Sequence, residues 1–195
     1  MKTAFQVAIA ALKLKHKQVS SLMRSTDNQL WRNLEYGDKS KIIELAQNYD
    51  MYRQQFEKLD DGQRYAQDVD ANINQIENGK CSKSLQKKYN KLAALKKIVQ
   101  SDDYERFFMT YPPSERLETQ IIKIPEERIP DFIRTYMVES KVQPDIFNRV
   151  CNEFPLPQVE QQVLYQGGQF QPAQPTQPIA PIAPIPPINY PTIPC

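Results

Sequence analysis

A stripe of mostly apolar residues at helical spacing lies near the amino end of the chain. It consists of Phe5, Ile9, Leu12, His16, Val19 and either Leu22 or Met23. This spacing predicts one amphipathic helix over residues 1–26. The segment has no acidic residue, and its basic residues are Lys2, Lys13, Lys15, Lys17 and Arg24. We expect this basic N-terminal helix to pack on the rest of the chain. A mitochondrial presequence is the alternative, and a secretory signal is disfavoured because lysines follow Leu12.

The helical body is predicted over residues 27–154. It opens with a short amphipathic turn around Leu30, Trp31 and Leu34, which ends near Gly37. A long helix follows, and its apolar residues step by three and four in a heptad seam. This seam consists of Ile42, Leu45, Tyr49, Tyr52, Phe56 and Leu59.

The register of this seam changes beyond Leu59, where the apolar positions are Ala66, Val69, Ile73 and Ile76. Such a shift predicts either a local change in helix winding or a break at Asp60-Asp61-Gly62. Asn78-Gly79 is typical of a helix end, because both residues tolerate the left-handed conformation.

A second amphipathic helix is predicted to begin at an N-cap formed by Ser82 or Ser84. Its apolar stripe consists of Leu85, Tyr89, Leu92, Leu95, Ile98 and Val99. The pattern continues through Phe108 and must end before Pro112-Pro113. Because the link between the two helices is short, we expect an antiparallel hairpin over about residues 39–111.

Residues 114–154 are predicted to form a cluster of short elements that packs against one end of the hairpin. Ile121 to Ile124 read as a short strand, and Pro130 and Pro144 each suit the first turn of a helix. The expected fold is therefore mainly α, a long antiparallel helical hairpin or small bundle with an extended polyproline arm at the carboxyl end.

Residues 155–195 form a proline-rich tail in which no charged side chain follows Glu160. Polyproline II has three residues per turn, so residues spaced by three form columns along it. One column consists of Pro172, Pro175, Pro178, Pro181, Pro184 and Pro187, and a second of Ile179, Ile182, Ile185 and Ile188. A solvated linker is the plain interpretation. The isoleucine column and Tyr190 favour contact with a partner instead.

Two short segments of the tail resemble peptide signals that recruit the ESCRT budding machinery. Pro178-Ile-Ala-Pro181 and its overlapping repeat to Pro184 resemble P[ST]AP, with isoleucine in place of the hydroxyl residue. Tyr190-Pro-Thr-Ile193 resembles YPxL, with isoleucine in place of leucine. These resemblances imply a trafficking or budding adaptor.

Composition removes several kinds of chemistry. The 195 residues include 5 glycines and neither a GxxxxGK[ST] loop nor a GxGxxG turn, so the common phosphate-binding loops are absent. The single histidine excludes a His-pair metal site, and the 3 cysteines lack CxxC spacing. We therefore expect no enzyme activity, cofactor or metal.

Cysteine and hydropathy patterns also bear on location. An odd number of cysteines suits a reducing compartment, so we expect the cytoplasm, a virion or a mitochondrion rather than secretion. Apolar runs fall well short of the ~20 residues of a membrane span.

Two lysine clusters could contact nucleic acid or another anionic surface. The candidate residues are Lys13, Lys15, Lys17, Lys80, Lys83, Lys87 and Lys91. The last four are predicted to share one helix face, which could follow phosphates. A solvated helix face that pairs with the acids of the preceding helix is the plainer interpretation.

The function predicted from these patterns is a non-enzymatic structural or adaptor subunit of a larger protein assembly, such as a virus particle or an organellar complex. It would bind neighbours through its helical seams and its tail. The alternative is a protein that binds nucleic acid or an anionic surface through the lysine clusters. The oligomeric state is left open.

Overall fold

The computed structural model describes residues 1–155, which form helices and no strand. The mainly α fold of packed helices is confirmed, and its long hairpin spans residues 2–71 rather than the predicted 39–111. The helices are α1 (Lys2–Tyr36), α2 (Lys39–Ala71), α3 (Ile73–Glu77), α4 (Lys83–Ala94), α5 (Lys96–Val99), α6 (Asp102–Thr110), the 3-10 helix η1 (Glu126–Arg128), α7 (Ile129–Glu139) and α8 (Pro144–Glu153).

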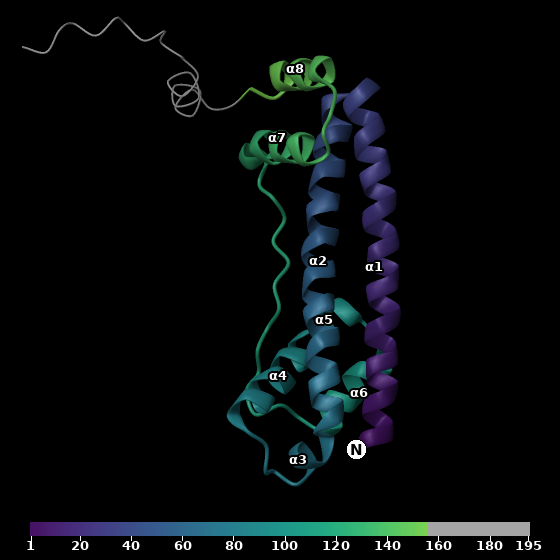
Figure 1. The fold of residues 1–195 in the computed structure, drawn as a ribbon, viewed down its shortest axis with the longest axis vertical. Coiled ribbons are helices and arrows are strands. Elements are labelled where there is room, and N and C mark those ends of the chain that lie inside the picture. Colours follow the sequence, from purple (N-terminus) through teal and green to yellow (C-terminus); the bar gives the residue numbers. More distant parts are fainter. Residues whose placement is uncertain (156–195) are drawn as a thin grey trace, which may run out of the picture. The chain divides into compact units, whose positions relative to one another are not determined.

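The main hairpin is formed by α1 and α2, which run side by side in opposite directions (Figure 1). Only Gly37 and Asp38 connect them. A Cβ atom on Gly37 would lie 2.8 Å from the backbone Cα of Asn33, so this close turn requires glycine. The Asp38 side chain accepts a hydrogen bond from the Lys41 amide at 2.8 Å and caps α2. These two residues therefore both end one helix and start the next.

The sequence predicts a helix that ends at residue 26 and a separate turn around Leu30, and this division is wrong because a single helix covers both segments. Helix α1 is continuous from Lys2 to Tyr36, and its buried stripe extends to Leu30 and Leu34. Residues 25–28 are of the type that often caps helices, but here tertiary contacts hold them helical. Thr26 is buried, and Asp27 accepts a hydrogen bond from the Tyr136 hydroxyl at 2.7 Å.

The expected break at Asp60-Asp61-Gly62 is also absent, because α2 continues through Gly62 to Ala71. A Cβ atom on Gly62 would lie 2.5 Å from Cδ1 of Leu95. The glycine thus permits close packing of α2 against the α4–α5 junction. The long helix ends at Ala71, before the predicted Asn78-Gly79, and it is the short α3 that ends at Asn78, where Gly79 has a φ of +66°.

The predicted second helix consists of three shorter helices rather than one. Ser82 caps α4 as expected, and its hydroxyl accepts from the Leu85 amide at 3.2 Å. The chain then bends after Ala94, and Gln100 adopts a left-handed φ of 52°. The acidic residues Asp102 and Asp103 follow, and they favour a new helix start through the helix dipole. The change of chain direction at Gln100 brings α6 onto α1, where Phe107 packs against Phe5.

The predicted strand at Ile121 to Ile124 is wrong, although the segment is held by hydrogen bonds that resemble strand pairing. The Gln54 side-chain amide donates to the Ile122 carbonyl at 2.7 Å and accepts from its N–H at 3.1 Å. Gln47 donates to the Ile124 carbonyl at 3.1 Å. Side chains of α2 thus satisfy the backbone groups that a neighbouring strand would otherwise satisfy.

The predicted short helices at Pro130 and Pro144 are confirmed as α7 and α8. They lie at the α1–α2 turn, whereas α3 to α6 lie toward the opposite end of the hairpin (Figure 1). Arg149 of α8 donates a hydrogen bond to the Leu34 carbonyl near the carboxyl end of α1. The short-helix cluster therefore packs on a hairpin end as expected, but that hairpin is α1–α2.

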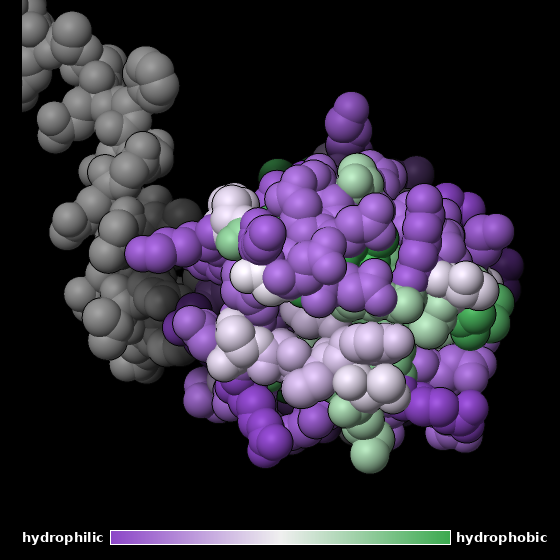
Figure 2. All heavy atoms as spheres, turned by 90° about the horizontal axis from the view of Figure 1, so that it is seen from below, coloured by the Kyte–Doolittle hydropathy of each residue, from purple (hydrophilic) through white to green (hydrophobic). Residues whose placement is uncertain are grey.

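Two hydrophobic cores follow from this arrangement. The α4–α6 core joins these helices to the far half of the hairpin, and its largest buried side chains include Phe5, Leu12, Leu59, Tyr89, Leu92 and Tyr104. The α7–α8 core contains Leu30, Leu34, Ile42, Leu45, Ala46, Ile129, Ile133, Tyr136, Met137, Val150 and Phe154. Seen from the end where α3 lies, the surface is mostly hydrophilic with small hydrophobic patches (Figure 2).

Candidate functional site

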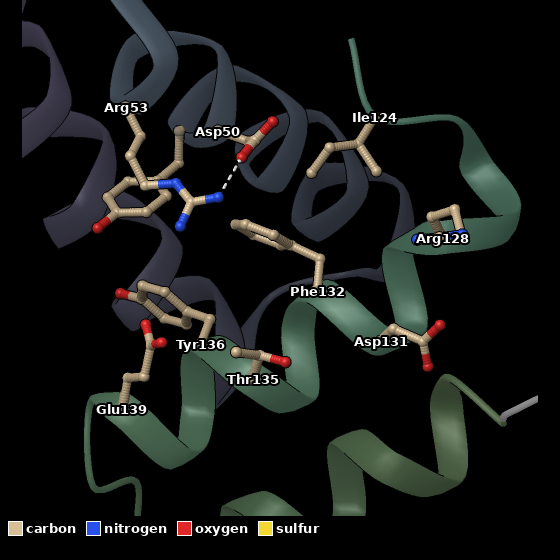
Figure 3. Close-up of a pocket in the computed structure, with 10 residues that line it drawn as sticks. Asp50, Arg53, Ile124, Arg128, Asp131, Phe132, Thr135, Tyr136 and Glu139 are labelled. Carbon is tan, nitrogen blue, oxygen red and sulfur yellow. Dashed lines mark hydrogen bonds and ion pairs between the residues drawn. The ribbon is translucent and has the colours of Figure 1, made fainter. Parts of the chain in front are cut away.

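A pocket lies between α2 and α7, bounded by Ile124 and Arg128 of the connecting segment (Figure 3). Its cavity has a volume of about 340 Å³. We call it the α2–α7 pocket. It is lined by Tyr49, Asp50, Arg53, Ile124, Arg128, Asp131, Phe132, Thr135, Tyr136 and Glu139.

Three aromatic rings form much of the pocket wall. Phe132 and Tyr136 are four residues apart on α7, so both lie on one helix face. The ring of Tyr49 on α2 meets the edge of Tyr136, with 5.4 Å between centroids, and its centroid lies 6.3 Å from that of Phe132. This arrangement provides an apolar surface with two phenol hydroxyls at its edge.

The acidic group at the base of the pocket is fully engaged. Asp50 is buried, and its two carboxylate oxygens accept from Arg53 Nη2 at 2.8 Å and from Gln54 Nε2 at 2.6 Å. Figure 3 shows the Arg53 guanidinium directed toward Asp50. Pairing compensates much of the cost of burying this carboxylate. Asp50 therefore holds the pocket together rather than offering a free acid.

The two tyrosines of the pocket keep their protons at neutral pH. Burial raises the pKa of Tyr49 above its usual value, and the nearby charge of Asp27 adds to this effect. Burial likewise raises the pKa of Tyr136, and its hydrogen bond to Asp27 acts in the same direction. The neutral hydroxyls supply no phenolate nucleophile, and the charged side chains of Arg128, Asp131 and Glu139 also line the pocket.

The sequence does not bring Tyr49, Phe132 and Tyr136 together. Tyr49 belongs to the predicted heptad seam, whereas Phe132 and Tyr136 follow Pro130 in the predicted short helix. Their separation of more than eighty residues leaves no local signal. The only available indication is the pair of aromatic residues four apart within residues 129–139.

The predicted basic face of the second helix is only partly formed. Lys80 precedes α4, which begins at Lys83, so the four lysines do not share one helix face. Lys83 and Lys87 are exposed on α4. Lys91 Nζ lies 3.4 Å from the Tyr65 hydroxyl and 5.2 Å from the centre of its ring.

One ion pair between a lysine of α4 and an acid of α2, of the kind expected from the sequence, is present. Lys88 Nζ of α4 lies 2.6 Å from an Asp68 carboxylate oxygen of α2. On α1, Lys13 and Lys17 are exposed, and Lys15 donates to Gln100 Oε1 at 3.5 Å. The two lysine clusters are thus on separate elements, and each retains exposed cations.

His16 lies on the buried stripe of α1, as its spacing predicts. Its ring packs on Phe56 with 4.6 Å between centroids, and Nε2 is 3.8 Å from Asp60 Oδ1. The Cys81 thiol donates to Gln86 Oε1 at 2.9 Å, and the contacts of His16 are with Phe56 and Asp60 rather than with Cys81. Within residues 1–155, no three His, Cys, Asp or Glu side chains are placed to hold a metal ion. The same residues contain no helix with the length and apolar character of a membrane span.

The candidate partner-binding residues of the tail lie outside the described residues. They are Pro172, Pro175, Pro178, Ile179, Pro181, Ile182, Pro184, Ile185, Pro187, Ile188 and Tyr190.

Comparison of the chain with protein-family models, with curated proteins and with solved structures gives no match.

Proposed function

We propose that this protein is a non-enzymatic structural or adaptor subunit of a larger protein assembly. It binds neighbouring proteins through exposed helical surfaces and through its proline-rich tail. The observation that carries the proposal is the period of three in residues 172–188, which places prolines in one column and isoleucines in another. A spacer has no need of the isoleucine column, whereas a binding segment uses it as contact surface.

The described body supports the same function. The long α1–α2 hairpin presents an extended surface, and several aliphatic side chains on the body are exposed. Leu14 is 59% exposed, Ile122 66% and Val138 65%. The α2–α7 pocket adds an aromatic surface of the type that binds apolar or proline-rich peptides. Each of these features suits contact with protein rather than chemical conversion of a substrate.

Deletion of residues 161–195 tests the proposal. In cells that produce the protein, gradient sedimentation of the intact chain should place it in a large complex. The truncated chain should sediment as a small species, because the tail contacts are lost. The helical signal in far-ultraviolet circular dichroism, expressed per molecule, should be the same for both chains, because α1 to α8 all lie before the deletion.

A matched control separates the tail pattern from the tail length. Replacing Ile179, Ile182, Ile185 and Ile188 by serine keeps every proline and leaves the length of the tail unchanged. Loss of the large complex in this variant supports a binding column. Unchanged sedimentation of both the serine variant and the truncated chain would contradict the proposed role of the tail.

Binding to nucleic acid or another anionic surface is the alternative function, and the exposed lysines favour it. Lys13, Lys17, Lys83 and Lys87 are exposed and form no ion pair with the other described residues. Binding of this kind weakens steeply as salt rises, because counterions are released from the phosphates. A retained affinity for nucleic acid from low to moderate salt, or no affinity at all, would exclude it.

A further inference from the structure

Helix α1 has a second stripe with apolar members, which lies opposite the centre of its buried face. Its large members are Val7, Leu14 and Leu22, which are 47%, 59% and 47% exposed. The opposite side of the same helix is buried in the two cores through residues such as Leu12 and Leu30. About half of each of these three side chains is therefore left uncovered by the rest of residues 1–155.

The residues between these three side chains are small or uncharged. Stepping from Val7 by four and three residues gives Val7, Ala11, Leu14, Gln18, Ser21 and Ser25, with Leu22 beside Ser21. We call this set the outer α1 stripe. Alternation of four and three is the spacing of a seam that faces another helix. The small serine side chains at positions 21 and 25 allow the backbone of that helix to approach closely.

Positive charge borders the outer α1 stripe. Lys13, Lys17 and Arg24 follow one edge, all three are exposed, and none pairs with an acid among the described residues. Residues 1–26 contain no acid to balance them. Near its amino end the stripe is joined by α6, which contributes Asp103 and Arg106 to a hollow beside Val7. Apart from Asp103 beside Val7, the charged side chains that border the stripe are therefore cations.

We infer that the outer α1 stripe binds an acidic amphipathic helix of a partner protein. The apolar seam would meet leucine or isoleucine side chains of that helix. Lys13, Lys17 and Arg24 would pair with glutamate or aspartate at its flanking positions. The inference rests on the proposed adaptor function and names the class of partner for this surface.

Charge and side-chain size favour this occupant over two others. A second copy of the chain would place Lys13, Lys17 and Arg24 against the same cations, and like charges across an interface oppose association. A membrane surface would favour large aromatic and aliphatic side chains in a helix that lies on it. The stripe instead carries Ala11, Ser21 and Ser25 between its few large residues and contains no aromatic residue.

Binding of designed helical peptides to the intact chain tests the inference. One labelled peptide carries leucine along a heptad seam with glutamate at the flanking positions, and its counterpart carries lysine in place of glutamate. Fluorescence anisotropy should detect binding of the glutamate peptide alone. Leu14→Gln should weaken that binding about tenfold, because it removes a central apolar contact.

A charge exchange gives the sharper result. The triple variant Lys13→Glu, Lys17→Glu, Arg24→Glu should lose the glutamate peptide and gain the lysine peptide. The control Lys83→Glu, Lys87→Glu, Lys80→Glu makes the same change in net charge on and beside α4, and it should bind the glutamate peptide like the intact chain. Circular dichroism should be unchanged in all variants, because these side chains are exposed.

Three results would overturn the inference. They are failure of the intact chain to bind the glutamate peptide, loss of binding in the α4 control as complete as in the α1 variant, and normal binding by Leu14→Gln. Vesicles of phosphatidylcholine and phosphatidylserine form a further arm, and tighter binding to them than to the peptide would assign the stripe to a membrane surface. If deletion of residues 161–195 leaves assembly intact while the peptide results hold, the proposed role of the tail fails and this inference stands.

Discussion

Tyr104 combines deep burial with a hydrogen bond to the backbone. It is 2% exposed, and its hydroxyl donates to the Leu92 carbonyl at 2.7 Å. Burial, with a smaller effect of Tyr89, raises the pKa of Tyr104 above its usual value of 10.0. The folded protein therefore resists ionisation of this phenol more strongly than the unfolded chain does. The difference makes stability depend on pH in the alkaline range.

Ionisation of this phenol affects the stability of the fold only above the pH at which the phenol of the unfolded chain ionises. Below about pH 10 the phenol is protonated in both states and has no effect on the pH dependence of stability. Above that pH the unfolded chain releases the proton and the folded chain keeps it, so the free energy of unfolding falls as pH rises. Tyr104→Phe should reduce stability at pH 7 by about 1 kcal/mol, through loss of the hydrogen bond. It should also reduce the fall between pH 9 and about pH 11.

Urea unfolding followed by circular dichroism across this pH range measures both effects. Tyr36→Phe is the matched control, because Tyr36 is 89% exposed and should change neither value. Tyr89 and Tyr136 also have raised pKa values, so a reduced fall rather than its removal is expected. An alkaline fall that is equally steep in Tyr104→Phe and in the intact chain would contradict the assignment.

Single residues also show where sequence reasoning fails. Gly62 reads as a helix break because glycine favours turns, and the register of the seam changes nearby. The structure explains the glycine by packing, since a Cβ atom would lie 2.5 Å from Leu95 Cδ1. That contact joins residues more than thirty positions apart, and no local pattern contains it. The cap of α4, by contrast, could be narrowed to Ser82 or Ser84 because a cap acts within its own turn, and Ser82 forms it.

At the scale of the element, the extended segment before η1 depends on side chains of α2. Gln54 forms two hydrogen bonds with the backbone of Ile122 and a third with Asp50. Gln54→Ala should release the segment of residues 112–125 without unfolding α2, because alanine is a strong helix former. Hydrogen exchange of the Ile122 amide should become faster, and limited proteolysis should cut this segment sooner.

Gln67→Ala provides the control on the same helix. Gln67 is exposed, and its side chain forms no hydrogen bond among the described residues. It should leave both measurements unchanged. If Gln54→Ala leaves the Ile122 amide as slow as before, the side-chain pairing does not hold the segment in place.

Which helices form was largely predictable, and how they pair was not. Pro130 and Pro144 mark true helix starts, and Gly79 marks a true turn, because these signals are local. The sequence reading paired the long helix with residues 82–111, since neighbouring helices with short links usually pack. That contact exists between α2 and α4, but α1 is the longer partner of α2 (Figure 1). A two-residue turn at Gly37 and Asp38 made this possible.

The candidate site was less accessible from the sequence than the fold. The α2–α7 pocket requires Tyr49 to meet Phe132 and Tyr136, which depends on where α7 packs along the hairpin. The spacing of the outer α1 stripe is present in residues 7–25. Its exposure, however, depends on which other face of α1 is buried, and the spacing alone does not determine that. Both surfaces are products of tertiary arrangement.

At the scale of the whole described body, the two hydrophobic cores lie at different ends of one hairpin (Figure 1). Helices α7 and α8 pack on η1 and on the half of the hairpin that contains its turn, through residues as far from the turn as Asp27 and Arg53, so they can open while the α4–α6 core stays intact. The α7–α8 core is also the smaller of the two. We therefore expect α7 and α8 to exchange amide hydrogens through a local opening that leaves α4, α5 and α6 folded.

Ile98→Ala distinguishes this behaviour from a single cooperative unit. Ile98 is 5% exposed in the α4–α6 core, and its truncation should lower the free energy of global unfolding by about 2–5 kcal/mol. Amides of α4 and α6 should then exchange faster. Amides of α7 and α8 should exchange at an unchanged rate, because Ile98 keeps its contacts when only that end opens.

Ile133→Ala is the companion variant in the α7–α8 core, where Ile133 is 1% exposed. It should speed the exchange of α7 and α8 directly, since their opening breaks its contacts. Hydrogen exchange followed by mass spectrometry on the full chain resolves both regions in one experiment. If Ile98→Ala accelerates α7 and α8 as much as α4 and α6, the two cores unfold together. The α1–α2 hairpin would then transmit stability along its whole length, and the α2–α7 pocket would be as rigid as the opposite end.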